Sequence, residues 1–331
     1  MKFLCNQFIP RSLWKEFIDS NLFTSPFQSY EFFRFFNSIP GYHADAFAVE
    51  EFGCLIALSV VTVQKEPGIK SFFSRRGIIY GGPLICPDHP AALPELIKQV
   101  QLFYDKKLIY IEIRNYFNYS TFKSIFARQG WEYQPWLNFH LNTTDKAEME
   151  SSMSSNRLRQ IHKAIKNGAV WKEADKLEDI QSFYQILDSL YKEKVKKPLM
   201  RWDFFKQFFE QSIGKYLLVY FQGKVIGGIM CFIFPAKAIY EFYICGLDHD
   251  YKNQYPSIMA TWAAMEYAYL NGIPLFDFMG AGSPEEQYGV RDFKARFGGK
   301  FDEHGRFLKI LNPFLYEIGK LGLKLLSKFQ K

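Results

Sequence analysis

The sequence predicts an α+β protein built from two domains. Its 331 residues, 48% of them hydrophobic, are enough for two cores at about 150 residues per domain. In each half the patterns follow one order: helices, a hairpin, a strand, a helix and a strand. Only the order of elements repeats, not the residues themselves. We place the boundary after Asn142, which gives domains 1–142 and 143–331.

The first predicted element of the N-terminal half starts at residues 25–28, Ser-Pro-Phe-Gln. Ser25 is a capping residue, Pro26 suits the first helical position, and Gln28 completes a capping box, so a helix follows. The remaining predicted elements are strands on both sides of a turn at 51–53, a strand at 77–85 with a glycine break, a helix at 89–108, a strand at 109–114, a helix ending at Gly130, and one strand at 133–143.

The second half is predicted in the same way. Gly168 closes a helix that starts near residue 154. The following elements are helices at 179–194 and 202–212, a hairpin over 215–234 that turns at Gln222-Gly223-Lys224, a strand at 238–247, a helix at 256–272, and a strand at 274–280. Residues 312–331 are predicted to form an amphipathic helix.

Charge and cysteine content limit the possible function classes. The net charge of +7 favours anionic ligands or a phospholipid surface without requiring nucleic acid. Five widely spaced cysteines without a CxxC pair indicate free thiols in a reducing compartment. The N-terminus is too short and polar for a signal peptide, and no apolar run reaches the length of about 20 residues that a bilayer span needs. We therefore expect a cytoplasmic protein, with peripheral contact to the inner face of the membrane as a further option.

The order of elements in the second half is found in GNAT-type acyltransferases, and three motifs resemble the Fem family. Residues 25–33 with 78–85 resemble the family's Q-x-x-x-W/F and GP elements. Residues 153–168 resemble its S-x-x-x-R-x-x-I-x-K-A-x-x-x-G helix, and 293–299, FKARFGG, resemble its F-K-x-x-F-G signature. The resemblance implies tandem GNAT-like domains with mixed central sheets. It implies an enzyme that transfers aminoacyl groups to peptidoglycan precursors, in cell-wall biogenesis.

Two departures from these patterns bear on the donor. Only about 35 residues, 179–214, lie between the basic helix and the hairpin, so the long coiled-coil arm of classical Fem enzymes is absent. The glycine-containing phosphate loop of GNAT enzymes is also missing, because residues 248–257 contain no glycine. A coenzyme A pyrophosphate would find no close backbone cradle, which favours an aminoacyl-tRNA donor over acyl-CoA. No tightly bound cofactor is expected.

Three residues are candidates for catalysis. The resemblance implies that Lys294 of FKARFGG sits at the reaction centre, where its charge would stabilise an oxyanion; the alternative is a surface lysine. Glu241 and Asp277 are acids inside apolar strands, where an unpaired carboxylate costs several kcal/mol. Either could act as general base for the attacking amine, with Asp277 ranked slightly higher, or each could be structural.

The predicted substrate-binding residues form two groups. Arg291 and Arg296 flank Lys294 and suit a diphosphate-bearing acceptor, unless they pair with Glu285 or Glu286. Phe293 and Tyr288 would line the channel. The basic helix before Gly168 adds a second group, which would bind phosphates of the acceptor or of tRNA, or else form a solvated face: Arg157, Arg159, Lys163 and Lys166.

The function that we predict is acyl transfer to an amine of a lipid- or nucleotide-linked muropeptide or another cell-envelope acceptor, by direct attack in a ternary complex. One alternative is an acyl-CoA-dependent N-acyltransferase acting on a sugar or lipid amine. Another is a non-catalytic nucleic-acid-binding module that uses the basic helix.

The six histidines lack metal-ligand spacing, so no metal is expected. The C-terminal helix would rest on an anionic bilayer or dock on the protein core: its apolar stripe is Phe314, Ile318, Leu321, Leu325 and Phe329, and its basic stripe is Lys320, Lys324 and Lys328.

Overall fold

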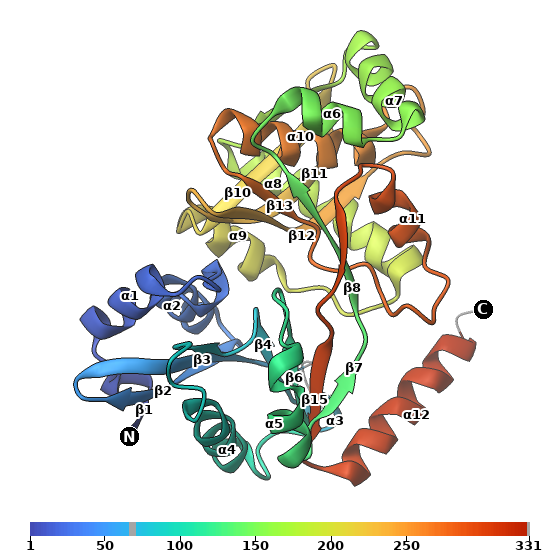
Figure 1. Cartoon of the computed structure of the whole chain (residues 1–331). Coiled ribbons are helices and arrows are strands. Elements are labelled where there is room, and N and C mark those ends of the chain that lie inside the picture. Colours follow the sequence, from blue (N-terminus) through green and yellow to red (C-terminus); the bar gives the residue numbers. More distant parts are fainter. Residues whose placement is uncertain (66–70, 330–331) are drawn as a thin grey trace. The chain divides into compact units, whose positions relative to one another are not determined.

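The computed structural model describes residues 1–65 and 71–329, and the side chains within that part except those of residue 71 and residues 323–329. It divides into two compact units, Met1–Pro135 with His304–Lys331, and Trp136–Glu303. Each unit is built on one mixed sheet with helices on both faces, so the predicted α+β class is confirmed (Figure 1).

The first unit contains a sheet ordered β1-β2-β3-β4-β6-β15-β7, with β5 paired to β3. Its strands are β1 (Lys2–Cys5), β2 (His43–Glu51), β3 (Cys54–Gln64), β4 (Arg76–Tyr80), β5 (Leu84–Ile85), β6 (Tyr110–Arg114), β7 (Glu132–Gln134) and β15 (Arg306–Ile310). Its helices are α1 (Arg11–Ser20), α2 (Tyr30–Ser38), α3 (Ser71–Ser74), α4 (Ala92–Tyr104), α5 (Lys123–Arg128) and α12 (Pro313–Phe329), with 3-10 turns η1 (Asn6–Phe8), η2 (Pro26–Gln28) and η4 (Ser120–Phe122). Only β4 and β6 run parallel among its described pairs.

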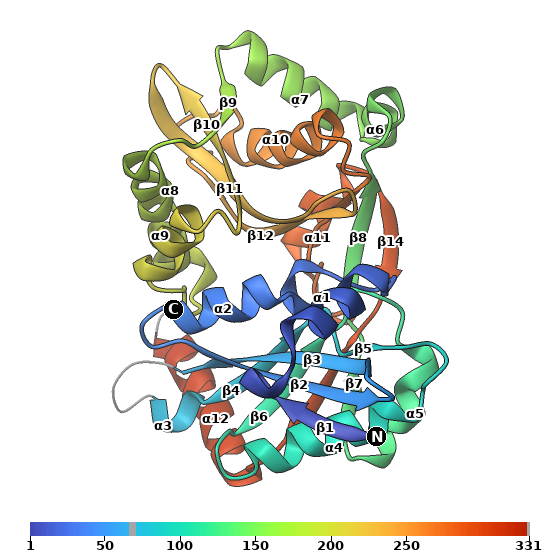
Figure 2. The same cartoon turned by 90° about the vertical axis from the view of Figure 1, so that its left-hand side faces the viewer.

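The second unit contains a sheet ordered β14-β8-β13-β12-β11-β10-β9. Its strands are β8 (Leu137–Asn142), β9 (Val170–Glu173), β10 (Gly214–Phe221), β11 (Lys224–Phe234), β12 (Ala238–Gly246), β13 (Leu275–Asp277) and β14 (Lys300–Glu303). Its helices are α6 (Lys146–Ser152), α7 (Ser155–Lys166), α8 (Leu177–Leu190), the π-turn η5 (Tyr191–Val195), α9 (Trp202–Glu210), α10 (Pro256–Leu270) and α11 (Gly289–Ala295). Helix α10 covers one face, and α8 and α9 cover the other (Figure 2).

Several sequence-based elements are confirmed by the structure. The hairpin turns at Gln222 and Gly223, both with positive φ (50° and 76°), as a two-residue hairpin requires. Helix α10 is buried almost all round, in keeping with its apolar composition. Residues 179–214, which were expected to contain no coiled-coil arm, include most of α8 and all of η5 and α9. None of the described helices is long and apolar enough to span a bilayer.

The division of the chain differs from the expected boundary at Asn142. Residues 133–143, expected to form one strand, form two: β7 joins the first sheet and β8 the second. Pro135 lies between them and cannot donate to a sheet ladder, which accounts for the break. The C-terminal residues, expected in the second domain, return to the first, because β15 inserts between β6 and β7.

The two N-terminal motifs of the Fem resemblance meet in the first unit. The buried side chain of Gln28 donates to the carbonyl oxygens of Tyr80 (3.2 Å) and Gly82 (3.1 Å). Gly81 has a positive φ of 77°, and a Cβ atom there would lie 2.4 Å from Gln28 Nε2. Glutamine and glycine are therefore required together to hold the turn after β4.

The C-terminal helix α12 is formed as predicted and docks partly on its own unit. Leu315 is buried, and Tyr316 packs edge-on against Tyr110 of β6. Phe314 and Leu321 remain exposed. The predicted stripe positions Leu325, Phe329, Lys324 and Lys328 have side chains that lie outside the described part of the structure.

Candidate active site

The site starts where two parallel strands of the second unit separate. Strands β12 and β13 pair only at Ile239 with Phe276 and at Tyr240 with Asp277, whereas β12 continues to Gly246. The next residue on β12 is Glu241. The register with β11 shifts here, since Cys231 faces Glu241 and Met230 faces Tyr243, so Phe242 is an extra, bulged residue. Such bulges redirect neighbouring side chains and are frequent beside active sites.

Glu241 forms a buried ion pair with Lys294 of α11. The Nζ–Oε1 distance is 2.8 Å, and the two side chains are 5% and 8% exposed. Lys294 also donates to the carbonyl oxygens of Phe278 (2.6 Å) and Gly280 (2.9 Å), so each of its three N–H groups has an acceptor. The alternative of a surface lysine does not describe this residue.

The second carboxylate oxygen of Glu241 has a different environment. Oε2 is buried and has no hydrogen-bond partner among the described residues. A buried carboxylate oxygen without a donor costs free energy, and such exceptions in a folded protein call for an explanation. A bound substrate donor would supply the missing partner.

Asp277 and Asn138 hold the backbone segment whose carbonyl oxygens accept hydrogen bonds from Lys294. Asp277 Oδ1 accepts from the backbone N–H of Met279 (2.6 Å) and from Asn138 Nδ2 (2.7 Å). Asn138 Oδ1 accepts from the N–H of Gly280 (2.7 Å). Met279 has a φ of 54°, which is costly for a non-glycine residue, so these bonds stabilise a strained turn. The turn aims the carbonyl groups of residues 278 and 280 at Lys294.

His140 on β8 extends this network. Its Nε2 contacts Asp277 Oδ2 and its Nδ1 contacts Asp302 Oδ2, both at 3.1 Å. Burial acts to lower the pKa of His140, but the two carboxylates outweigh it and raise the pKa to about 9. Burial likewise acts to raise the pKa of Asp277, and His140 and Asn138 reverse this and lower it.

The geometry separates the two candidate bases. Both oxygens of Asp277 are occupied by His140, Asn138 and a backbone N–H, and its pKa is lowered, so it is a poor proton acceptor. Glu241, ranked second from the sequence, has the free oxygen. Asp277 is placed as a positioning residue for the turn, and Glu241 as the better candidate for the base.

The predicted residues around Lys294 support the loop. Arg291 Nε donates to the carbonyl oxygen of Ala281 (3.0 Å), and its Nη2 donates to that of Ser283. The alternative pairing of Arg291 with Glu285 or Glu286 is not formed among the described residues. Tyr288 directly precedes α11, and its ring lies 2.8 Å from the place where a Cβ atom on Gly282 would be. Helix α11 was not predicted, because a short segment between glycines shows little periodicity.

The basic helix α7 divides into one buried cation and several exposed ones. Arg157 is 3% exposed and lies over the rings of Phe293 and Phe297 at 4.6 and 4.4 Å. Burial, and then the charge of Arg296, lower the pKa of Arg157 to about 10. Arg157 thus joins α7 to α11. The predicted phosphate-binding residues that face solvent are Arg159, Lys163, Lys166 and Arg296.

Sequence reasoning missed Asn138, His140 and Asp302. A signal for the first two was present in residues 137–142, LNFHLN, where polar residues alternate with apolar ones in a strand. Their partner Asp277 is more than 130 residues away in the chain, so only the sheet order β8-β13-β12 brings them together.

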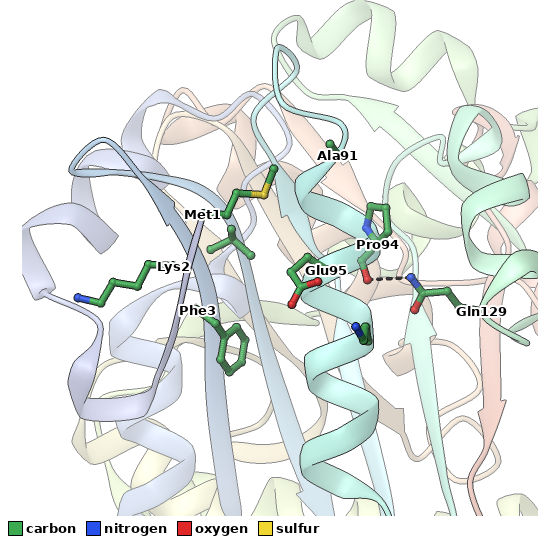
Figure 3. Close-up of a pocket in the computed structure, with 9 residues that line it drawn as sticks. Met1, Lys2, Phe3, Ala91, Pro94, Glu95 and Gln129 are labelled. Carbon is green, nitrogen blue, oxygen red and sulfur yellow. Dashed lines mark hydrogen bonds between the residues drawn. The ribbon is translucent and has the colours of Figure 1, made fainter.

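Two other features bear on ligand binding. A cavity of about 450 Å³ lies in the first unit and contains none of the predicted site residues (Figure 3); it is lined by Met1, Lys2, Phe3, Glu95, Lys98, Gln129 and neighbours. At the N-terminus of α10, Asp248 accepts from Ser257 N (3.1 Å) and Ser257 Oγ. A carboxylate therefore occupies the helix end where a phosphate would bind.

Residues 220–323, which include Glu241, Asp277 and Lys294, match the model of the FemAB family. This segment is Fem-like. The match confirms the predicted resemblance to the Fem family and the prediction of an acyltransferase. No curated protein matches the sequence.

Solved structures support the predicted fold. FemX matches with a TM-score of 0.72 and 15% identity over 96% of this chain and 99% of that chain. A tandem GNAT protein from the clavulanic acid biosynthesis pathway matches with a TM-score of 0.60 and 8% identity, over 94% and 99%. The L-PGS of Bacillus licheniformis matches with a TM-score of 0.58 and 11% identity, over 94% and 96%. The prediction of tandem GNAT-like units is thereby confirmed.

Proposed function

We propose that this Fem-like protein transfers an aminoacyl or acyl group to an amine of a peptidoglycan precursor or another cell-envelope acceptor. The observation that carries the proposal is the buried Glu241–Lys294 pair where β12 and β13 separate, in which Glu241 Oε2 has no hydrogen-bond partner among residues 1–65 and 71–329. An oxygen that needs a donor is suited to receive a proton from an attacking amine.

The proposed reaction proceeds by direct attack in a ternary complex. The acceptor nitrogen attacks the carbonyl carbon of the donor ester while Glu241 Oε2 takes a proton from that nitrogen. A C–N bond forms and the C–O bond to the donor breaks; Glu241 then returns the proton to the leaving oxygen. Because all three N–H groups of Lys294 are engaged, stabilising the oxyanion requires Lys294 to exchange one carbonyl partner for the substrate oxygen.

An aminoacyl-tRNA donor is favoured over acyl-CoA. Asp248 occupies the N-terminus of α10, so its negative charge would repel a pyrophosphate there. A Cβ atom on Gly246 would lie 2.5 Å from Ser257 N, which indicates that the strand end and the helix start are already in close contact. The exposed cations of α7 would contact tRNA phosphates.

The protein would act in the cytoplasm and would contact the inner face of the membrane through Phe314 and Leu321, two exposed apolar residues of α12.

The proposal is tested by single-turnover transfer with the purified full chain. The donors are bulk tRNA charged with labelled amino acids and, separately, labelled acetyl-CoA; the acceptor is a nucleotide-linked muropeptide, and mass spectrometry identifies the product. We expect a new amide with charged tRNA and none with acetyl-CoA. A product formed only from acetyl-CoA would establish the N-acyltransferase alternative, and a chain that forms no amide with either donor would refute the proposed acceptor class.

A further inference from the structure

The first unit contains a cluster of arginines that the proposed reaction does not use. It lies on one face of three adjacent strands, β4, β6 and β15. In the ladders, Tyr80 faces Arg114, and Arg114 faces Arg306. Like charges placed directly opposite each other in a sheet destabilise it unless an opposite charge compensates them.

The cluster contains one carboxylate for three guanidinium groups. Glu112 lies two residues before Arg114 on the same face. One of its two carboxylate oxygens, Oε1, accepts from both Arg114 Nε and Arg306 Nη1, the latter at 3.0 Å. Arg76 at the start of β4 instead donates to the neutral Gln64 Oε1 at 3.1 Å, and it forms no ion pair within residues 1–65 and 71–329. These four side chains therefore carry a formal excess of two positive charges.

The surroundings are mostly buried but not closed. The side chains of Glu112 and Arg306 are 15% and 16% exposed, and that of Arg114 is 31% exposed. Burial, followed by the charge of Arg114, lowers the pKa of Arg306 to about 10. Burial acts to raise the pKa of Glu112, yet the arginines overcome it and lower the pKa to about 2. Charges interact strongly in such surroundings, so an excess of two is unfavourable unless an anion approaches.

We infer that Arg76, Arg114 and Arg306 form a binding site for a phosphate-type oxyanion in the first unit. Guanidinium groups bind phosphate oxygens in pairs of parallel hydrogen bonds, and a doubly charged phosphate or a diphosphate would match the formal excess. Contacts link Arg76 to Arg114: Gln64, the acceptor for Arg76, donates from Nε2 to the Tyr80 hydroxyl at 3.1 Å, and the Arg114 guanidinium lies 5.3 Å from the centre of the Tyr80 ring. The site stands independently of the proposed acyl transfer.

A purely structural role for Glu112 is the competing explanation. In that role the carboxylate only ties β15, which arrives from the C-terminal end of the chain, to β6. The two explanations differ in the effect of replacing Glu112 by glutamine. Both predict a lower melting temperature, but only an anion site predicts tighter anion binding, because the substitution raises the excess positive charge by one.

The test is titration calorimetry of the full chain with inorganic pyrophosphate at constant ionic strength. We expect a single site with a Kd below about 1 mM, weakened by about tenfold or more in Arg76→Gln and tightened severalfold in Glu112→Gln. Arg76 shares no ion pair with Glu112, so its variant should fold even if Arg114→Gln does not. Arg128→Gln, an exposed arginine of the same unit, is the matched control and should bind as the wild type does.

Further titrations distinguish the sources of the anion. Uridine diphosphate binding more tightly than pyrophosphate would identify a nucleotide-linked ligand, and equal affinity would identify the diphosphate alone. Absence of binding in the wild type, an unchanged Kd in Arg76→Gln, or no tightening in Glu112→Gln would each overturn the site. Glu241→Gln, which is expected to lose acyl transfer but keeps the shape of its side chain, should bind pyrophosphate as the wild type does, so a failure of acyl transfer and a failure of this site are separable.

Discussion

The two units each place a carboxylate at their pair of parallel strands, but the charges around it differ. In the second unit Glu241 pairs with one lysine, so the pair is neutral, and its second oxygen has no hydrogen-bond partner in the part of the chain that the structure describes. In the first unit Glu112 serves two arginines through one oxygen, with a third arginine nearby. A neutral pair with a free acceptor suits proton transfer, whereas a cationic cluster suits anion binding. Similar strand arrangements can therefore support different chemistry, and the difference lies in a few side chains.

The largest effect that would sharpen this comparison is expected for Glu241→Gln. The amide keeps the shape of the side chain but cannot accept the proton, so single-turnover transfer should fall by about 10²–10⁴-fold. The measurement is amide formation from charged tRNA under saturating donor and acceptor. Glu285→Gln, an exposed residue of the neighbouring loop, is the control and should retain the rate. Full activity in Glu241→Gln would remove this residue from the chemistry.

The next effect concerns stability and the neutrality of the second pair. Lys294→Met leaves the Glu241 carboxylate buried without its cation, which should lower the free energy of unfolding by about 3–5 kcal/mol. Combining it with Glu241→Gln should recover much of that loss, because no buried charge then remains unpaired. Urea unfolding of both single variants and the double variant gives the coupling. A double variant no more stable than Lys294→Met would contradict a pair held by charge.

The surroundings of the two carboxylates could not be predicted equally well from the sequence. Lys294 could be predicted from FKARFGG, and Glu241 from an acid inside an apolar strand. The contacts of Asp277 could not be predicted, because its partners Asn138 and His140 reach it only through strand pairing across more than 130 residues. Arg306 meets Glu112 across 194 positions, and no local pattern encodes such a contact.

The fold was predicted more completely than the site, for a related reason. Helices and hairpins are recorded in local periodicity, so most were placed correctly. The boundary was misplaced because it depends on where the C-terminal strand β15 inserts, which is a choice among several sheet edges. Short elements between glycines, such as α11, also carry too few residues to show a period.

A smaller effect is expected from pH, through His140 in the second unit. Its pKa rises on folding from 6.5 to about 9, so its stabilising contribution is complete below about pH 6.5 and is lost as pH rises through 9. The lowered pKa values of Asp277 and Asp302 have the opposite sign: their contribution is present above their ordinary values and is lost as pH falls.

Unfolding free energy should therefore decrease by roughly 1–3 kcal/mol between pH 6.5 and 9.5 in the wild type. His140→Gln should flatten this dependence, and His249→Gln, at an 89% exposed position, should leave it unchanged. Denaturant unfolding across the pH series provides the measurement. An equally steep decrease in His140→Gln would show that another group titrates.

The smallest effect is expected for the exposed cations of α7, which contrast with the half-buried arginines of the first unit. Lys163 lies at the surface, 5.7 Å above the ring of Tyr255, so solvent and salt screen its charge. If α7 contacts tRNA phosphates, Lys163→Gln should raise the KM for charged tRNA about threefold, without changing kcat, and reduce the salt slope by about one. Lys15→Gln, on an exposed helix of the first unit, is the control. Unchanged KM and salt slope in Lys163→Gln would indicate that α7 presents a solvated basic face. The half-buried arginines of the first unit would then remain as the anion-binding groups of this molecule, because their charges are less screened by water.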